Sequence, residues 1–489
     1  MWQIDWSKIA EVLTYQSDKP MIFSSGLFLF LFLGFSLVYA LLRKKDTARI
    51  LFVILFSYYF YYKSSGTYFF LLGIVTVADF FIAGRMARIE SRARRRALLL
   101  LSLSINLGLL FYFKYTNFFY QMLAPLWNGS FQPLDIFLPV GISFFTFQSL
   151  SYTIDVYRRQ LQPLHRLLDY AFYVSFFPQL VAGPIVRARD FIPQIRKPLF
   201  VSTEMFGQGV FFIVSGLFKK AVISDYISVN FVERIFDNPG LYSGIENLFG
   251  VYGYALQIYC DFSGYSDMAI GIALLLGFRF PINFNSPYKA DSITDFWHRW
   301  HISLSTWLRD YLYISLGGNR KGQVRTYVNL LIVFFATGLW HGAGATFFIW
   351  GLYHGLFLVV ERMGLGKLLE KNCFRGLNHI YTALVVVVGW VFFRADTLAD
   401  AKVILHQMFT WENGIYPASL FVNRKVIFLA VLGVLLSGIA QSICPKLREH
   451  LYEKEVTKTV DIVIMAVLLF LCTMYLVSST YNPFIYFRF

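Results

Sequence analysis

The sequence predicts an all-α, polytopic membrane protein with about ten to twelve transmembrane helices, together with re-entrant and interfacial helices. Of the 489 residues, 57% are hydrophobic and only 15% are charged, and the mean hydropathy is +0.54. This composition is typical of integral membrane proteins rather than soluble ones. Apolar runs recur along the chain, and several are long enough to cross a bilayer as helices. They are 21–42, 97–110, 205–218, 327–340, 346–360, 381–393, 426–443 and 460–479.

The charge pattern predicts the orientation of the chain in the membrane. The net charge is +15, but the basic residues are distributed among loops between apolar runs, which favours a positive-inside topology over nucleic-acid binding. The basic loops 43–49 and 85–96 are therefore expected in the cytoplasm, whereas 124–135 has no Lys or Arg and is expected outside. Residues 1–20 lack an apolar core, so they are not a secretory signal, and we expect an extracytoplasmic interfacial segment there.

The chain is expected to form one membrane domain over residues 1–489, because no linker, charge-rich soluble region or repeat divides it. The segment 169–198 departs from simple spans. Its apolar part is short, contains Pro178, Gly183 and Pro184, and has basic residues on both sides. Two cytoplasmic flanks around a broken apolar segment predict a re-entrant element.

Several charged side chains lie in apolar surroundings. Asp261 and Asp267 occur in "YCDFSGYSDMAIG", and Asp79 and Lys114 are also flanked by apolar residues. A charge at membrane depth is costly, so each is expected to lie at an interface or to face a partner or a wet cavity.

Other patterns exclude several kinds of chemistry. Four widely spaced cysteines, at 260, 373, 444 and 472, predict single buried thiols rather than disulfides or a zinc site, and no metal site is expected. The sequence has no P-loop, no dinucleotide-binding glycine motif, no HExxH and no GxSxG. ATP hydrolysis, hydride transfer and a serine acyl-enzyme are therefore poorly supported.

Among the eight histidines, His341 has the least usual surroundings, because residues 334–351 contain no charge. A buried imidazole there is expected to be neutral, and a neutral imidazole can act as a general base toward a hydroxyl. The glycines at 338, 342 and 344 would let a substrate or another backbone approach closely. By residue pattern alone, an isolated histidine in an apolar run is more often structural. The others at 165, 379, 406 and 450 are expected in loops or at interfaces.

Residues 291–322 are too polar to span, and we expect a cytoplasmic-side loop and helix there. The spacing places Phe296, Trp300, Ser303 and Trp307 on one helical face, and basic residues follow at 299, 309, 320 and 321. Such a helix either anchors the protein at the interface or binds the phosphates of an anionic cofactor. Composition alone favours the anchor.

The stretch "DFWHRWHISLSTWLRDYLYISLGGNR", followed 40 residues after His301 by "GLWHG", resembles the membrane-bound O-acyltransferase (MBOAT) family. The similarity is greatest to the bacterial branch of alginate and peptidoglycan O-acetyltransferases and teichoic acid D-alanyl transferases. The fragments "FPQLVAGPIVR", "DFSGYSDMAIG" and "PFIYFRF" support the resemblance.

The resemblance implies a helical bundle pierced by a tunnel. We expect a multi-pass protein of the cell (inner) membrane, and the basic residues that follow the first span predict that its N-terminus lies outside. An acyl thioester would enter from the cytoplasm and an acceptor from the other side. His341 matches the catalytic histidine of the family and His301 matches the second one. His298 departs from the family pattern, so surface placement is favoured for it over a catalytic part.

The predicted function is transfer of an acetyl group from acetyl-CoA to an extracytoplasmic polysaccharide hydroxyl or to a partner relay protein, with no bound cofactor. His341 would be the base, and His301 would orient the donor or donate to the oxyanion. With Asp295, Arg299 and Asp310 nearby in sequence, His301 is expected to find polar partners and to tolerate charge. Donor-binding candidates are Trp297, Arg299, Trp300, Ser303, Trp307, Arg309, Asn319, Arg320 and Lys321.

Two alternatives remain open from the sequence. A carrier protein could supply the acyl group, as in D-alanylation, and would dock through acidic helices on the cytoplasmic face. A transporter of polysaccharide or lipid-linked sugar would also have many spans and buried carboxylates. The transporter would tolerate His341→Ala in its fold and partly in flux, whereas an acyltransferase would keep its fold and lose turnover.

Overall fold

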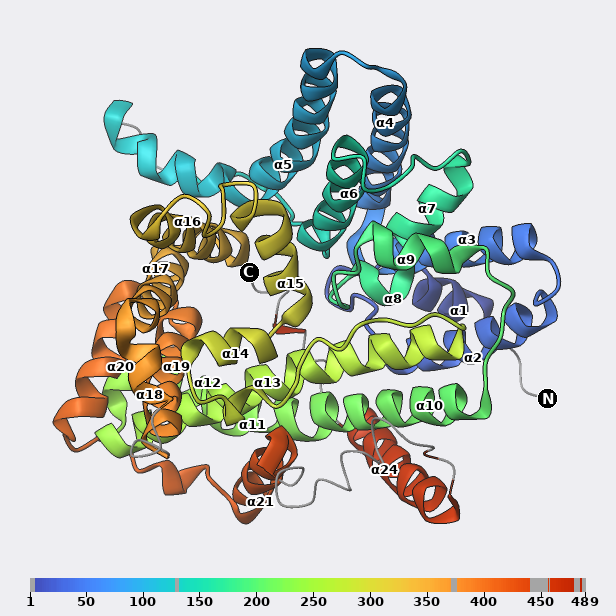
Figure 1. Cartoon of the computed structure of the whole chain (residues 1–489). Helices are drawn as coiled ribbons and strands as arrows, with labels where there is room; N and C mark the ends of the chain where they lie inside the picture. The colour runs from blue at the N-terminus through green and yellow to red at the C-terminus, as the bar shows by residue number, and fades with distance from the viewer. Residues whose placement is uncertain are drawn as a thin grey trace. The chain divides into compact units, whose positions relative to one another are not determined.

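The computed structural model describes residues 5–127, 132–370, 376–439, 456, 458–478 and 484–485. Every regular element in these ranges is a helix, which confirms the all-α class (Figure 1). The chain divides into two compact units, Met1–Val201 with Ile272–Phe280 and Ser202–Gly271 with Pro281–Phe489. The expectation of one membrane domain stays a prediction.

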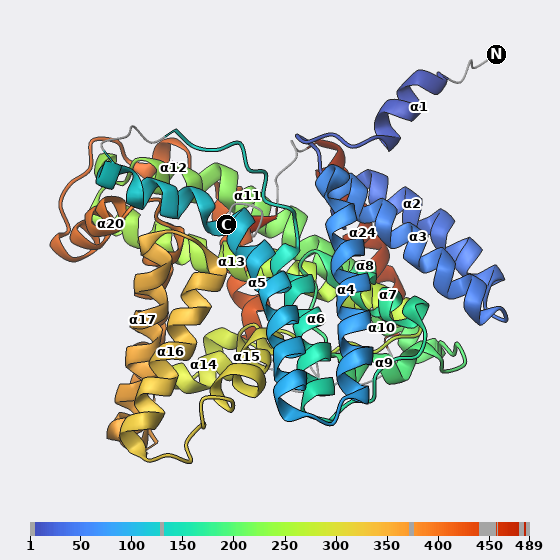
Figure 2. The same ribbon diagram turned by 90° about the horizontal axis from the view of Figure 1, so that it is seen from above.

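Nine α-helices lie within Met1–Val201 among the described residues, and α4, α5 and α6 pack side by side there (Figures 1 and 2). In their contact, Ser102 Oγ and Asn106 Nδ2 donate to the buried Asp79 carboxylate at 2.6 and 2.7 Å, so Asp79 has the partners that its apolar surroundings require. The helices are α1 (Trp6–Leu13), α2 (Gly26–Leu41), α3 (Asp46–Ser65), α4 (Phe69–Arg88), α5 (Arg92–Leu123), α6 (Ile142–Tyr157), α7 (Leu167–Ser175), α8 (Phe177–Leu180) and α9 (Ala188–Ile195).

The broken apolar segment at 169–198 has the predicted interruption. It forms three short helices, α7, α8 and α9, of 9, 4 and 8 residues, none long enough to span a bilayer. After α8 the backbone turns back on itself so tightly that a Cβ on Gly183 would lie 2.3 Å from the Pro178 carbonyl oxygen. The predicted interruption of this segment is therefore confirmed. That the segment enters and leaves the membrane on the same side stays a prediction.

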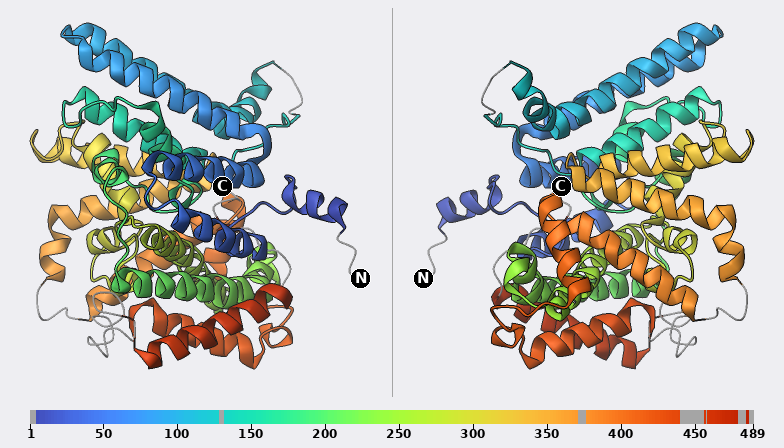
Figure 3. Two further views of the ribbon diagram at one scale, coloured as in Figure 1. Left: turned by 90° about the vertical axis from the view of Figure 1, so that its right-hand side faces the viewer. Right: turned by 90° about the vertical axis from the view of Figure 1, so that its left-hand side faces the viewer.

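The second unit holds the remaining helices. In it α24 packs against α10 (Figures 1 and 3), and α10 meets α13 so closely that a Cβ on Gly216 would lie 2.4 Å from the Gly264 oxygen. Small residues at such a crossing are typical of membrane helix packing. The helices are α10 (Thr203–Leu217), α11 (Asp225–Ile227), α12 (Glu233–Asp237), α13 (Gly244–Leu275, whose last turn belongs to the first unit), α14 (Ile293–Arg299), α15 (Ile302–Leu308), α16 (Gln323–His341), α17 (Ala345–Val360), α18 (Gly366–Leu369), α19 (Leu377–Arg394), α20 (Leu398–Thr410), α21 (Arg424–Val434) and α24 (Thr459–Ser478).

Asp261 and Asp267 of α13 are paired with lysines from a π-helical turn, Phe218–Ser224. Lys220 Nζ lies 2.5 Å from Asp261 and 2.7 Å from Asp225, and Lys219 forms an ion pair with Asp267. The predicted need for partners at Asp261 and Asp267 is therefore confirmed.

Four stretches of the described chain are long and apolar enough to cross a membrane: Asp46–Arg88, Arg92–Leu126, Leu377–Arg394 and Thr459–Val477. The helix α2 is apolar but shorter. A polytopic helical membrane protein is thus confirmed, and the count of ten to twelve spans stays a prediction. In α1 no residue is buried, and its position at an interface also stays a prediction.

Candidate active site

Residues 296–307 do not form the single helical face that their spacing predicted. The chain breaks between α14 and α15, where His301 adopts a left-handed conformation with φ 44° and ψ 54°. Histidine is among the few non-glycine residues enriched there. The break is stabilised by a distant segment, since Asn285 N donates to Arg299 O at 2.9 Å and Ile302 N to Asn283 O at 3.0 Å. Helical periodicity carries no signal of such non-local pairing.

His301 is enclosed by this break and fully buried. Its Nδ1 lies 3.2 Å from Asn283 Oδ1, and its ring faces Phe262 at 4.7 Å between centroids. His301 lies outside the four membrane-length stretches, between two seven-residue helices, and burial lowers its pKa to about 3. The expectation that His301 tolerates charge is therefore wrong.

The charged neighbours expected for His301 pair with one another instead. Arg299 Nε lies 2.7 Å from Asp295 Oδ2, and Arg309 Nε lies 2.8 Å from Asp310 Oδ1. Both arginines are within four residues of their aspartate partners in sequence. The His301 ring instead points into the protein and contacts the Asn283 amide.

His341 is the last residue of α16 and is 4% exposed. Its ring lies among three aromatic rings, Trp340, Trp350 and Phe393, with centroids at 4.8, 5.0 and 5.1 Å. All three are contacts with apolar rings, as the uncharged run around His341 predicted. The imidazole is thereby held in one place by large, rigid side chains.

The glycines around His341 have different roles. A Cβ on Gly338 would lie 2.4 Å from the Phe347 oxygen of α17, so this glycine admits another backbone as predicted. A Cβ on Gly342 would meet the Phe347 ring at 2.2 Å, and Gly344 has only ordinary contacts. The close α16–α17 pairing, visible in Figures 1 and 2, places α17 beside the end of α16.

The two histidines meet at one indole. The ring of Trp340 lies 5.9 Å from His301 and 4.8 Å from His341 between centroids. Two imidazoles separated by 40 residues are thus brought to a common aromatic cluster. A third buried histidine, His354, belongs to the same cluster through Trp350 at 5.3 Å. His354 was not predicted from the sequence, because its neighbours in sequence are those of an ordinary apolar helix.

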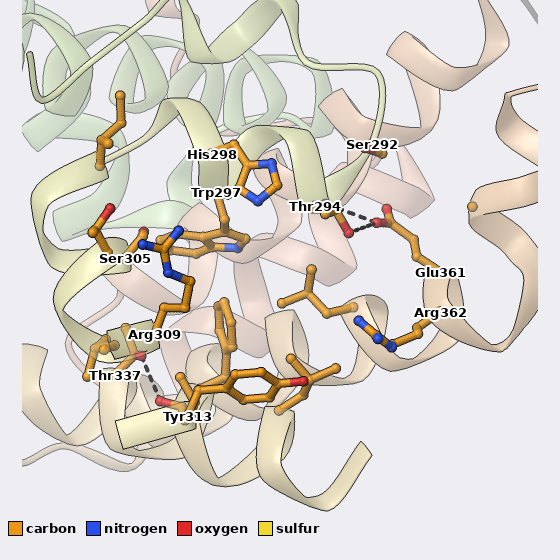
Figure 4. A pocket seen from close by; sticks show the side chains of 18 of the residues that line it. Ser292, Thr294, Trp297, His298, Ser305, Arg309, Tyr313, Thr337, Glu361 and Arg362 are labelled. Carbon is orange, nitrogen blue, oxygen red and sulfur yellow. Dashed lines mark hydrogen bonds between the residues drawn. The ribbon is translucent and has the colours of Figure 1, made fainter. Parts of the chain in front are cut away.

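A pocket of about 1030 Å³ lies beside this cluster (Figure 4). Two of its lining residues link it to His341. Thr337 lies one turn before His341 on α16, and the Trp297 ring contacts Trp350 at 5.7 Å, which in turn contacts His341. The polar residues that line it include Thr294, His298, Ser305, Arg309, Tyr313, Glu361 and Arg362.

Only two of the nine predicted donor-binding residues line the pocket, namely Trp297 and Arg309. Trp300, Ser303 and Trp307 are buried in the packing, and Arg299 is held by Asp295. The other three, Asn319, Arg320 and Lys321, are exposed in a turn and do not line the pocket. His298 is exposed, as expected, and it also lines the pocket.

Two pocket residues from a later segment were missed. Glu361 Oε1 accepts from Ile293 N at 2.6 Å, and Oε2 accepts from Thr294 Oγ1 at 2.6 Å, so this carboxylate holds the start of α14. Arg362 follows it and lines the pocket. The contacts join residues 67 or 68 apart, and no spacing in the sequence signals them.

His165, His379 and His406 are exposed. His165 lies in a loop as expected, whereas His379 and His406 lie on α19 and α20, and their position at an interface stays a prediction. Cys260 and Cys472 are buried free thiols, as expected. His450, Cys373, Cys444 and the last residues of "PFIYFRF" lie outside the described residues.

Comparison with known proteins identifies relatives of this chain. The sequence model of the membrane-bound O-acyltransferase family matches residues 158–399. The probable alginate O-acetylase AlgI of Pseudomonas aeruginosa is 43% identical, over 80% of this chain and 76% of the relative. The peptidoglycan O-acetyltransferase of Helicobacter pylori is 36% identical, over 98% of this chain and 100% of the relative. The teichoic acid D-alanyltransferase of Bacillus subtilis is 31% identical, over 52% of this chain and 66% of the relative.

Proposed function

This chain belongs to the membrane-bound O-acyltransferase family, and on that premise we propose that it transfers acetyl groups from cytoplasmic acetyl-CoA to a hydroxyl of an extracytoplasmic polysaccharide, directly or through a relay protein. The observation that carries the proposal is the placement of His301 and His341 against one indole, Trp340. The transporter alternative is set aside, because the family consists of O-acyltransferases.

Acyl transfer from a thioester to a hydroxyl needs a base near the hydroxyl and a fixed position for the thioester carbonyl. We assign the base to His341, since its ring is buried among large aromatic side chains and an imidazole can accept a proton from a hydroxyl. His301, on the other side of Trp340, would position the reacting groups.

The pocket suits the donor. His298, Arg309 and Arg362 give it cationic or titratable groups that would attract the phosphates of coenzyme A (Figure 4). Val333 and Phe334 add an apolar wall along which a pantetheine arm would run, and Thr337 marks the end nearest His341 in sequence. His298 and Arg362 are therefore proposed as phosphate-binding groups in place of Asn319, Arg320 and Lys321, which do not line the pocket.

A carrier-protein donor is the second candidate. The similarity to teichoic acid D-alanyltransferases covers about half of this chain. Arg320 and Lys321 are exposed and outside the pocket, where they would attract an acidic carrier helix.

The test uses the full chain in lipid vesicles with acetyl-CoA or acetyl carrier protein carrying labelled acetyl, and with alginate or peptidoglycan fragments as acceptors. We expect label on the polysaccharide from acetyl-CoA, and its loss in His341→Ala but not in His406→Ala, a matched exposed histidine. Label transferred only from the carrier protein would select the second candidate. An H341A protein that folds and still transfers would overturn the assignment of the base.

A further inference from the structure

One amide oxygen organises the surroundings of His301. Asn283 is 1% exposed, and its Oδ1 accepts from Ser303 N at 3.1 Å and from Ser303 Oγ at 2.9 Å. The same oxygen lies 3.2 Å from His301 Nδ1. Asn283 is therefore tied to α15 by two donors on one residue and faces the imidazole with the same atom.

These contacts determine which amide atom faces the histidine. A backbone N–H can only donate, so the Asn283 atom that receives Ser303 N must be the oxygen and not the amide nitrogen. An amide oxygen can only accept, and His301 Nδ1 must therefore carry the hydrogen in this contact. Because the fully buried ring is neutral, it has one N–H, and its Nε2 then bears the lone pair.

We propose that Asn283 is a positioning residue that holds His301 in the Nδ1–H tautomer, so that Nε2 serves the reaction as a hydrogen-bond acceptor. This inference rests on the proposed function for its catalytic meaning, although the tautomer itself does not. An acceptor at Nε2 would orient a substrate N–H or O–H, and it cannot stabilise an oxyanion by donation. Of the two roles predicted for His301 from the sequence, orientation is kept and oxyanion donation is removed.

The surroundings of Asn283 Nδ2 indicate that this side chain is present for the contacts of its Oδ1. Asn283 Nδ2 is buried and has no hydrogen-bond partner within the part of the chain that the structure describes. A buried donor left unpaired by the protein is costly. An apolar residue of the same size would avoid that cost, so the side chain is explained by what Oδ1 does for His301 and Ser303.

The first test reads the tautomer directly. The full chain, labelled with ¹⁵N-histidine and reconstituted in lipid, is examined by solid-state NMR, in which protonated and unprotonated ring nitrogens have well-separated shifts. The signals of His301 are identified by their loss in His301→Gln. We expect a protonated Nδ1 and an unprotonated Nε2. The opposite pattern in the wild-type protein would overturn the proposal.

Three variants make the test specific to Asn283. Asn283→Leu removes the acceptor at similar volume and should abolish the preference for Nδ1–H, whereas Asn283→Asp keeps an acceptor and should retain it. Ser303→Ala removes one donor from the same oxygen and should leave the tautomer of His301 unchanged. If Asn283→Leu keeps the wild-type ring pattern, Asn283 does not set the tautomer. If that variant fails to fold, the wild-type and Asn283→Asp spectra still decide.

Kinetics then tests the catalytic meaning. We expect Asn283→Leu to lower kcat at least tenfold with little change in KM for the donor, and Asn283→Asp to retain more activity than Asn283→Leu. Equal loss in both would mean that the amide acts only structurally. If the tautomer is as proposed but no donor supports transfer by the wild-type protein, the proposed function fails and the assignment of the tautomer stands.

Discussion

Gly351 of α17 faces Gly338 of α16: a Cβ built on Gly351 would lie 3.1 Å from Gly338 Cα and 2.3 Å from the Phe334 oxygen. Two backbones meet here without side chains between them. His341 follows Gly338 by three residues, and Trp350, which contacts His341 at 5.0 Å, precedes Gly351. The close approach therefore sets the position of His341 relative to its aromatic enclosure.

Gly351→Ala should separate α16 and α17, because a backbone oxygen cannot yield as a flexible side chain does. We expect at least a tenfold fall in transfer rate and a lower melting temperature. Gly108→Ala in α5 is the control, since nothing lies within 4 Å of its Cβ position, and it should change neither. Wild-type activity in Gly351→Ala would show that the crossing does not position His341.

The sequence predicted the class of fold and the two histidines but not their geometry. Composition suffices for a helical membrane protein, and the resemblance of the motifs around His301 and His341 to the family singled out the pair, whose catalytic role stays a prediction. The left-handed His301 was not predictable, because the strand-like pairing with residues 283–285 that holds it is non-local. For the same reason a helical face was predicted where two short helices occur.

Some residues of the pocket were predictable from the sequence and others were not. Arg309 and Trp297 were found by their residue type within a motif, whereas Arg362 and Glu361 come from a segment with no motif of its own. Asp261 and Asp267 were recognised as needing partners, since charge in an apolar run is costly. Their lysines were not named, because Lys219 and Lys220 lie about 40 residues or more away in sequence and reach α13 only through the folded π-helical turn.

Arg362→Ala should weaken donor binding if the pocket holds coenzyme A. We expect KM for acetyl-CoA to rise about tenfold and kcat to be retained. A rise of this size corresponds to the loss of one charge-assisted contact of about 1.5 kcal/mol. Arg325→Ala is the control, because Arg325 is exposed on α16 and does not line the pocket. An unchanged KM in Arg362→Ala would remove the pocket from donor binding.

Lys220→Met should destabilise the second unit strongly. The lysine is 1% exposed and pairs with the buried Asp261 and the half-buried Asp225, so its removal takes this cation from both carboxylates. Breaking such a pair typically costs about 3–5 kcal/mol. Thermal unfolding in detergent measures the effect, and Lys8→Met, at an exposed pair, should leave the melting temperature unchanged. Equal melting of Lys220→Met and wild type would mean that the carboxylates take up protons instead.

The topology is tested by cysteines introduced at Ser7 and Asn319, both exposed. The positive-inside pattern predicts that the N-terminal segment lies outside and the turn after α15 lies in the cytoplasm. In sealed spheroplasts an impermeant thiol reagent should therefore label the first position and not the second. After permeabilisation both should react, and labelling at Asn319 before that step would reverse the predicted orientation.

Glutamine should replace His301 with less loss of activity than it replaces His341. His341→Gln removes the base and should cost about 10²- to 10⁴-fold in kcat. His301→Gln offers an amide N–H to Asn283 Oδ1 and should retain part of the activity. A double variant no worse than His341→Gln alone would mean that the two act as one unit.

The pH profile separates their contributions. Burial lowers the pKa of His301 to about 3, so His301 stays largely neutral between pH 5 and 8. If His341 is the base, transfer should fall on acidification with a single apparent pKa at or below about 6.5, as protonation removes its lone pair. Because His301 does not titrate in this window, His301→Gln should lower the plateau and leave the midpoint of the acid limb in place. The measurement is transfer from labelled acetyl-CoA from pH 5 to 8 for both proteins. A midpoint that shifts or disappears in His301→Gln would instead assign the titrating base to His301.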